Sequence, residues 1–114
     1  YPWGNSEPDG EHANFYWLAG DTDRAGSYPA GASPYGALDM AGNVSEWVAD
    51  WYGEYTTSPY KTYNPQGPES GPHRVARGGS YLFSAFLIRS AERYWVSPYY
   101  VDDDLGFRCA FSED

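Results

Sequence analysis

The chain has 114 residues, of which seven are basic and sixteen acidic, and its net charge is −9. This charge excludes a nucleic-acid partner, since a phosphate backbone is held by a basic surface. The length allows a single domain. Leu, Ile, Val and Phe together number only 16, which would indicate disorder, but five Trp and twelve Tyr supply the missing apolar area. We therefore expect a folded domain with an aromatic core.

The sequence contains no run of eighteen apolar residues, so we expect no membrane-spanning segment in this chain. Its start at Tyr1 lacks the basic and apolar regions of a signal peptide. We expect a piece of a longer protein, whose compartment is not indicated. Cys109 is the single cysteine and cannot form an internal disulfide. We expect it to be a small buried apolar residue, the common state of a free cysteine.

Gly and Pro account for 22 of the 114 residues and interrupt almost every periodic run. Residues 1–36 and 53–73 are therefore predicted to be turn-rich loops. Loops of this length in a compact domain are often functional or held by something other than apolar packing, such as a bound ion.

The clearest helix pattern runs from about Val44 to Tyr52. Asn43 is a good N-cap, and Glu46 three residues later completes a capping-box pattern. Apolar residues at 44, 47, 48 and 51 then fall on one helical face. We predict one short helix here, ended by Gly53.

Three short runs are typical of strands. They cover residues 74–81, 88–96 and 105–111. The last two are predicted to be the closing strands of a small sheet.

Four blocks of this sequence resemble one known family. They are Tyr-Pro-Trp-Gly-Asn at 1–5, Tyr-Gly-Ala-Leu-Asp-Met-Ala-Gly-Asn-Val-Ser-Glu-Trp at 35–47, Arg-Gly-Gly-Ser-Tyr at 77–81 and Leu-Gly-Phe-Arg-Cys at 105–109. In this order they resemble the formylglycine-generating enzymes, also called sulfatase-modifying factors. The resemblance implies an α+β, C-type-lectin-like fold, rich in loops, with a small antiparallel sheet and one clear short helix. It identifies residues 1–114 as the carboxy-terminal part of such a domain, which implies the amino-terminal part as a partner of this segment.

The resemblance does not extend to the catalytic residues. Active members carry a copper-binding cysteine pair just after the Gly-Gly-Ser-Tyr block, whereas residues 82–88 contain no cysteine. Copper(I) is selected by soft thiolates, which Phe or Ile cannot replace. Related sulfoxide synthases use three histidines to bind iron, and this chain has only His12 and His73. We therefore expect no formylglycine-generating activity.

The family resemblance also implies calcium as a cofactor. Asp39, Gly42, Val44 and Glu46 match positions that bind the ion, through two carboxylates and two backbone carbonyls. Calcium takes six to eight oxygen ligands, and a glycine lets carbonyls turn inward between carboxylates. The alternative is that Glu46 only caps a helix and Asp39 lies in an ordinary turn.

A second calcium site is implied in the preceding loop. Its ligands would be the side chains of Asn14 and Asp21 and the carbonyls of Phe15 and Asp23. The alternative is a solvated acidic loop.

The segment between Tyr81 and Leu105 combines aromatic and acidic residues, and in the family it lines the substrate groove. Such a surface suits a protein or peptide partner, because Tyr and Trp give rigid contact area at low entropic cost. The alternative is that the rings form the core. We expect Trp95 and Tyr99 to be anchors, because they flank the turn at Pro98. The predicted ligand-binding residues are Phe83, Phe86, Tyr94, Trp95, Tyr99, Tyr100 and Asp102.

Three functional hypotheses follow. The leading one is a non-catalytic, calcium-stabilised domain that binds a protein or peptide ligand. Such a domain is similar to the variable proteins of diversity-generating retroelements, in which the Arg-Gly-Gly-Ser and Gly-Phe-Arg motifs flank a variable segment. Residues 82–88 and 99–104 contain only residue types that the codon variation of those proteins produces. The alternatives are an oxidoreductase whose catalytic ligands lie in the absent amino-terminal portion, and a scaffold without a ligand.

Overall fold

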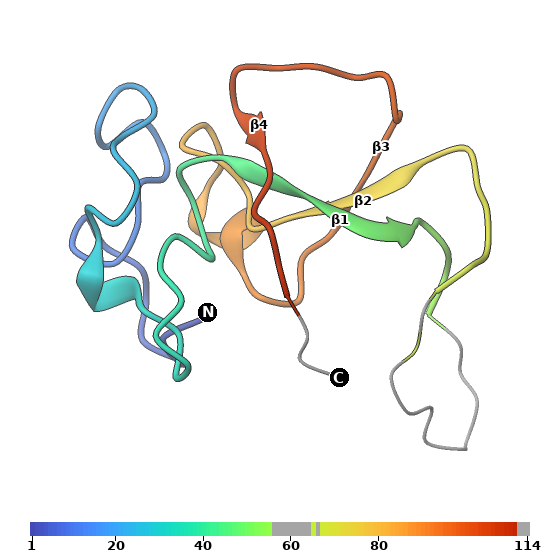
Figure 1. Ribbon diagram of the computed structural model, residues 1–114. Helices are drawn as coiled ribbons and strands as arrows, with labels where there is room; N and C mark the ends of the chain where they lie inside the picture. The colour runs from blue at the N-terminus through green and yellow to red at the C-terminus, as the bar shows by residue number, and fades with distance from the viewer. Residues whose placement is uncertain (56–64, 66, 112–114) are drawn as a thin grey trace.

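The computed structural model describes residues 1–55, 65 and 67–111. A four-stranded sheet forms its centre, with strand order β3-β2-β1-β4 and the amino-terminal loops at one end (Figure 1). No helix in these ranges is long and apolar enough to cross a membrane. The elements, with η for a 3₁₀ helix, are η1 (Pro29–Gly31), β1 (Ser45–Trp51), β2 (Arg74–Arg77), η2 (Ala85–Ile88), β3 (Tyr94–Val96) and β4 (Leu105–Gly106).

The helix predicted over 44–52 is wrong, because this segment forms strand β1. Asn43 has a φ of 65°, in the left-handed region, and not the extended backbone of an N-cap. Its side-chain amide instead bonds the backbone of Asp23, accepting from the N–H at 2.8 Å and donating to the carbonyl at 3.1 Å. The Glu46 carboxylate binds Arg108 and caps no helix. Pairing of β1 with both β2 and β4 outweighs the local capping pattern.

The three predicted strands exist but are shorter than expected. The run at 74–81 ends at Arg77, since Gly78 and Gly79 take φ values of 88° and 68°. The run at 88–96 is a strand only in β3, and the run at 105–111 only in β4. β4 lies parallel to β1, so the sheet is mixed and not wholly antiparallel.

Cys109 is exposed, so the expectation of a buried cysteine is wrong. The reason is the early end of β4 at Gly106. Beyond that residue the strand alternation that would bury every second side chain no longer applies.

The core is less aromatic than composition predicts. Its buried cluster is mostly small or aliphatic, and three aromatic side chains pack against it from partly exposed positions. Other aromatic side chains lie at the surface: Trp17 is 57% exposed and Tyr99 is 93% exposed. The buried cluster is Ala13, Phe15, Ala41 and Ile88, and the residues packed against it are Tyr1, Trp3, Phe83 and Ala85.

Gly42 joins the amino-terminal loops to the sheet. Its φ is 77°, and a Cβ atom there would lie 2.3 Å from the carbonyl oxygen of Asn14, so no larger residue fits. The Asn43 N–H donates to the same carbonyl at 2.8 Å, and the Tyr81 N–H donates to the carbonyl of Asn43 at 2.9 Å. These contacts hold three distant segments together beside the sheet.

Candidate ligand-binding site

Strand β3 presents different residues to the two faces of the sheet. Successive side chains of a strand point to opposite faces, so Tyr94 and Val96 share one face and Trp95 lies on the other. Ala76 of β2 is the register partner of Tyr94 and therefore shares its face. This face forms the floor of a pocket.

The pocket has a volume of about 280 Å³ and draws on every strand of the sheet. Its remaining walls come from residues just after the Arg-Gly-Gly-Ser-Tyr block and from the loop between β3 and β4. Segments about sixty residues apart in sequence thus meet at one site. The lining residues are Ser45, Ala76, Leu82, Phe83, Tyr94, Val96, Tyr100, Asp102, Asp104 and Leu105.

Hydrogen bonds hold the acidic wall of this pocket in place. The Ser45 N–H donates to the carbonyl of Asp104 at 2.8 Å, which ties the loop to β1. The Tyr100 hydroxyl donates to the carboxylate of Asp102, and the Asp103 N–H donates to the same carboxylate at 2.9 Å. Two of the three consecutive acids, Asp102 and Asp104, line the pocket.

These contacts separate the pKa values of neighbouring carboxyl groups. The hydrogen bond from Tyr100 lowers the pKa of Asp102, so this group stays ionised further into the acid range. A hydrogen bond to Asp102 raises the pKa of Asp103. The wall therefore concentrates negative charge at neutral pH, and a positive group beside it would relieve the repulsion.

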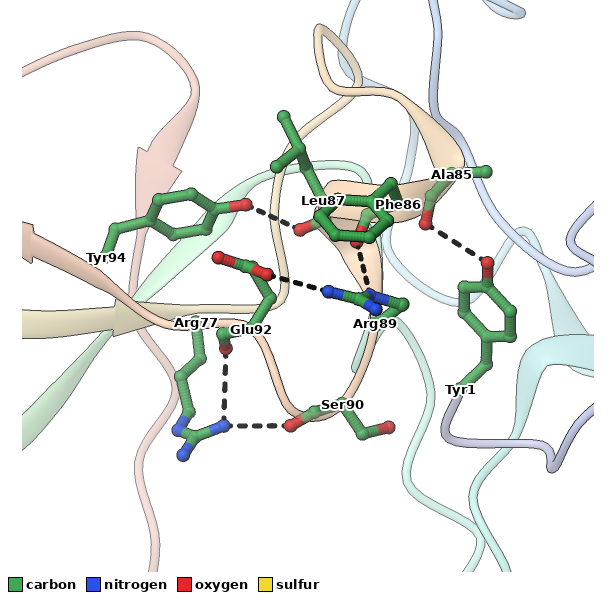
Figure 2. Close-up of polar contacts among 9 residues, drawn as sticks. All are labelled: Tyr1, Arg77, Ala85, Phe86, Leu87, Arg89, Ser90, Glu92 and Tyr94. Carbon is green, nitrogen blue, oxygen red and sulfur yellow. Dashed lines mark hydrogen bonds and ion pairs between the residues drawn. The ribbon is translucent and has the colours of Figure 1, made fainter. Parts of the chain in front are cut away.

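Tyr94 forms an aromatic wall and is fixed at its hydroxyl. The hydroxyl donates to the carbonyl of Leu87 at 2.6 Å (Figure 2), and the ring lies 5.3 Å from that of Phe83. Burial raises the pKa of Tyr94 to about 12. The ring is thus held in one orientation before any ligand arrives.

The structure brings together four of the seven predicted ligand-binding residues and separates three. Phe83, Tyr94, Tyr100 and Asp102 line the pocket. Trp95 lies on the opposite face of the sheet, with its ring 4.7 Å from that of His73.

The other two separated residues lie away from the pocket lining. Tyr99 is 93% exposed in the loop that follows β3. Phe86 lies in η2 with its ring against the Arg89 guanidinium, whose Cζ atom is 3.5 Å from the ring centre. Arg89 also pairs with Glu92 at 3.2 Å (Figure 2).

Sequence reasoning missed several lining residues. Ser45, Ala76 and Val96 carry no local pattern of a site, because strand register alone decides which face they join. Asp104 follows Asp102 in an acidic run, and that run was the available indication.

An exposed aromatic turn beside the pocket was also missed. Tyr16 and Trp17 have φ values of 48° and 61°, a costly left-handed backbone for aromatic residues. The Tyr16 N–H donates to the carbonyl of Phe83 at 2.9 Å, and the Trp17 N–H to that of Tyr81 at 2.8 Å. The run of three large apolar residues at 16–18 in a predicted loop was the available indication of an exposed apolar surface.

The second predicted calcium set contains an unsatisfied buried oxygen. Asn14 is 1% exposed, and its Oδ1 atom has no hydrogen-bond partner among the described residues. Its Nδ2 atom donates to the carbonyl of Asp21 at 2.8 Å. A buried amide oxygen without a donor is costly, and a cation would satisfy it. One oxygen of the predicted set, the Oδ1 atom of Asn14, therefore suits a cation.

The first predicted calcium set is engaged differently. Arg108 donates to both carboxylate oxygens of Glu46, at 2.6 and 2.5 Å, and to the carbonyls of Leu38 and Asp39, each at 2.9 Å. The Asp39 carboxylate accepts from the N–H of Gly26 at 2.7 Å. Because a guanidinium already neutralises Glu46, an ion held by this carboxylate together with Asp39, Gly42 and Val44 would have to displace Arg108.

The family model for the sulfatase-modifying factor enzyme 1-like domain matches residues 1–113. The chain belongs to this family. The resemblance of the four sequence blocks is thus confirmed, and with it the C-type-lectin-like, loop-rich fold.

Proteins similar to this chain have names that indicate different functions. A serine/threonine-protein kinase, pkn1, of Chlamydia caviae is 46% identical over 112 residues, covering 96% of this chain and 17% of its own length. The formylglycine-generating enzyme of Mus musculus is 37% identical over 124 residues, covering 96% of this chain and 33% of its own. The solved structure of Treponema denticola variable protein 1 superposes with a TM-score of 0.77 at 36% identity, covering 85% of this chain and 34% of that one. The chain thus spans between 17% and 34% of the length of these relatives.

Proposed function

We propose that this segment is a non-catalytic, calcium-stabilised domain that binds a protein or peptide ligand. The observation that carries the proposal is the pocket on the Tyr94 face of the sheet, where aromatic and acidic side chains converge. Its volume of about 280 Å³ has room for one or two side chains of a larger partner. The absence of cysteine from residues 82–88 supports a non-catalytic role.

Calcium has a stabilising and not a catalytic role in this proposal. The unpartnered Oδ1 atom of Asn14 supports a site with Phe15, Asp21 and Asp23. Asn43 contacts Asp23 through its side chain, and its N–H bonds the carbonyl of Asn14, so an ion there would reinforce the contact between the loop and the sheet.

The test of the binding proposal is a selection of randomised displayed peptides on the full chain. We expect enriched peptides whose affinity falls when the pocket wall is removed by Tyr100→Ala. Glu69→Gln, a change at an exposed acid outside the pocket lining, is the control that should leave affinity unchanged. The proposal would be overturned if the selection enriched no peptide, or if Tyr100→Ala left the affinity of the enriched peptides unchanged.

A second candidate is a variable protein of a diversity-generating retroelement. The similarity to Treponema denticola variable protein 1 favours it. Copies of the coding sequence from related strains should then differ mainly at codons of residues 82–104, with adenine positions changed. Uniform copies would exclude this candidate.

The oxidoreductase alternative rests on the similarity to the formylglycine-generating enzyme of Mus musculus. It requires catalytic metal ligands upstream of the present residues. Histidines at metal-binding spacing in that region of the full-length sequence would favour it over the binding domain.

A further inference from the structure

We infer that the pocket on the Tyr94 face binds a positively charged side chain, Arg or Lys, of a protein or peptide partner. The inference rests on the proposed binding function and adds the chemistry of the ligand. It depends on three features of the pocket: the sign of its charge, its aromatic walls and the rigidity of its acidic wall.

The described lining of the pocket contains two carboxylates and no basic residue. Asp102 and Asp104 line the cavity, and Asp103 lies between them in sequence. The arginines that follow η2 and end β2 have partners of their own: Arg89 pairs with Glu92, and Arg77 donates to the carbonyl of Ser90 at 2.9 Å (Figure 2). The negative charge of the pocket is therefore left for a partner to neutralise.

Further negative charge lies close to the same wall. Burial raises the pKa of Tyr81, and the charges of Asp103 and Asp21 raise it further. Tyr81 in turn contacts the exposed Trp17 ring edge to face, with ring centres 5.2 Å apart. The acidic field thus extends from the pocket toward the aromatic turn, which is a suitable approach for a basic peptide.

The walls of the pocket suit a guanidinium or ammonium group with its aliphatic stem. Phe83, Tyr94 and Tyr100 supply aromatic faces, and Leu82 and Val96 supply apolar contact. Cations are attracted to aromatic faces, and long basic side chains bury their methylene groups against apolar surface. Combined with two carboxylates, these walls favour Arg or Lys over an apolar or acidic side chain.

The acidic wall is built before binding. The backbone carbonyl of Asp104 is tied to β1 through the Ser45 N–H, and the Asp102 carboxylate is held by Tyr100 and by the N–H of Asp103. A partner therefore meets charges that need little ordering, which reduces the entropic cost of association.

The experiment uses pools of short random peptides with one fixed central residue, which is Arg, Lys, citrulline, Glu or Leu. Binding of each pool to the full chain is measured at low and at raised salt. We expect the Arg and Lys pools to bind best and to lose affinity with salt. The tightest Arg peptide should bind about tenfold more weakly when its Arg is replaced by the uncharged isostere citrulline.

Protein variants locate the charge. Asp104→Asn and Asp102→Asn remove charge but keep shape, so each should weaken the Arg peptide several-fold and leave the citrulline peptide unchanged, while Glu69→Gln changes neither. If peptides bind through the pocket but citrulline or Leu serves as well as Arg, the charge inference fails and the binding function stands. If no pool binds, both fail. Arg preference that survives both Asn substitutions would also overturn the inference.

Discussion

Arg108 donates two hydrogen bonds to the carboxylate of Glu46, although the two residues are 62 positions apart in sequence. The same guanidinium donates to the carbonyls of Leu38 and Asp39, so one side chain joins the carboxy-terminal strand region to the loop before β1. The interaction with Glu46 raises the pKa of Arg108. The arginine of the Gly-Phe-Arg motif thus holds the start of β1 in place.

Replacing Arg108 by Lys should destabilise the domain. An ammonium cannot reproduce the planar fork that reaches four oxygens. We expect a loss of about 1 to 2 kcal/mol in the free energy of unfolding, since the site is partly exposed. Urea unfolding measures this loss, and Arg24→Lys at an exposed position is the control. Equal stability of the two variants would show that the hydrogen bonds of Arg108 contribute little to the free energy of unfolding.

The relation between Glu46 and Arg108 also shows what sequence could and could not predict. The motif blocks gave the family and the fold, because both residues belong to them. They could not give β1, since the Asn43 and Glu46 pattern is equally consistent with a helix cap. Only tertiary pairing decides that Glu46 faces Arg108. The lining of the pocket was predicted only in part, for a similar reason. The sequence indicated the segment between Tyr81 and Leu105, but strand register decides that Tyr94 lines the pocket and Trp95 does not.

Calcium should raise the melting temperature, and a chelator should lower it. An ion that binds only the folded state stabilises it by about 2.7 kcal/mol at one hundred times its dissociation constant. Asp21→Ala should abolish the response if the ion binds beside Asn14. Glu46→Ala should abolish it if the ion binds at the Asp39 loop instead. If neither chelator nor calcium changes the melting temperature, the calcium proposal fails, and a bound water molecule is the better partner for the Asn14 oxygen.

The domain should not convert a peptide cysteine to formylglycine. Residues 82–88 offer no thiol, and Cys109 is exposed beyond β4. After incubation with copper and a sulfatase-type cysteine peptide, mass spectrometry should find the peptide unchanged relative to a metal-only control. Turnover that disappears in Cys109→Ser would reveal a chemistry with a single cysteine.

Tyr94 should make the domain less stable in strong alkali. Its pKa is raised to about 12, whereas an unfolded tyrosine ionises near 10. Between these values the folded state keeps a proton that the unfolded state loses, so the free energy of unfolding falls as pH rises. Tyr94→Phe should flatten this dependence and cost about 1 kcal/mol at neutral pH through the lost bond to Leu87. Denaturant unfolding across this pH range measures both effects, and an unchanged slope would assign the alkaline loss to other tyrosines.

Tyr100 should contribute more to binding than Trp95, which the sequence predicted to be an anchor. Tyr100 lines the pocket and orients Asp102, whereas Trp95 lies on the other face against His73. Anchors at interfaces cost about 2 kcal/mol or more on truncation, so Tyr100→Ala should weaken a selected peptide by more than about tenfold. Tyr100→Phe keeps the ring but frees Asp102, and should give an intermediate loss. Trp95→Ala is the matched truncation and should change affinity little. If Trp95→Ala weakens the peptide more than Tyr100→Ala, the ligand uses the opposite face of the sheet, and Trp95 is the anchor that the sequence predicted.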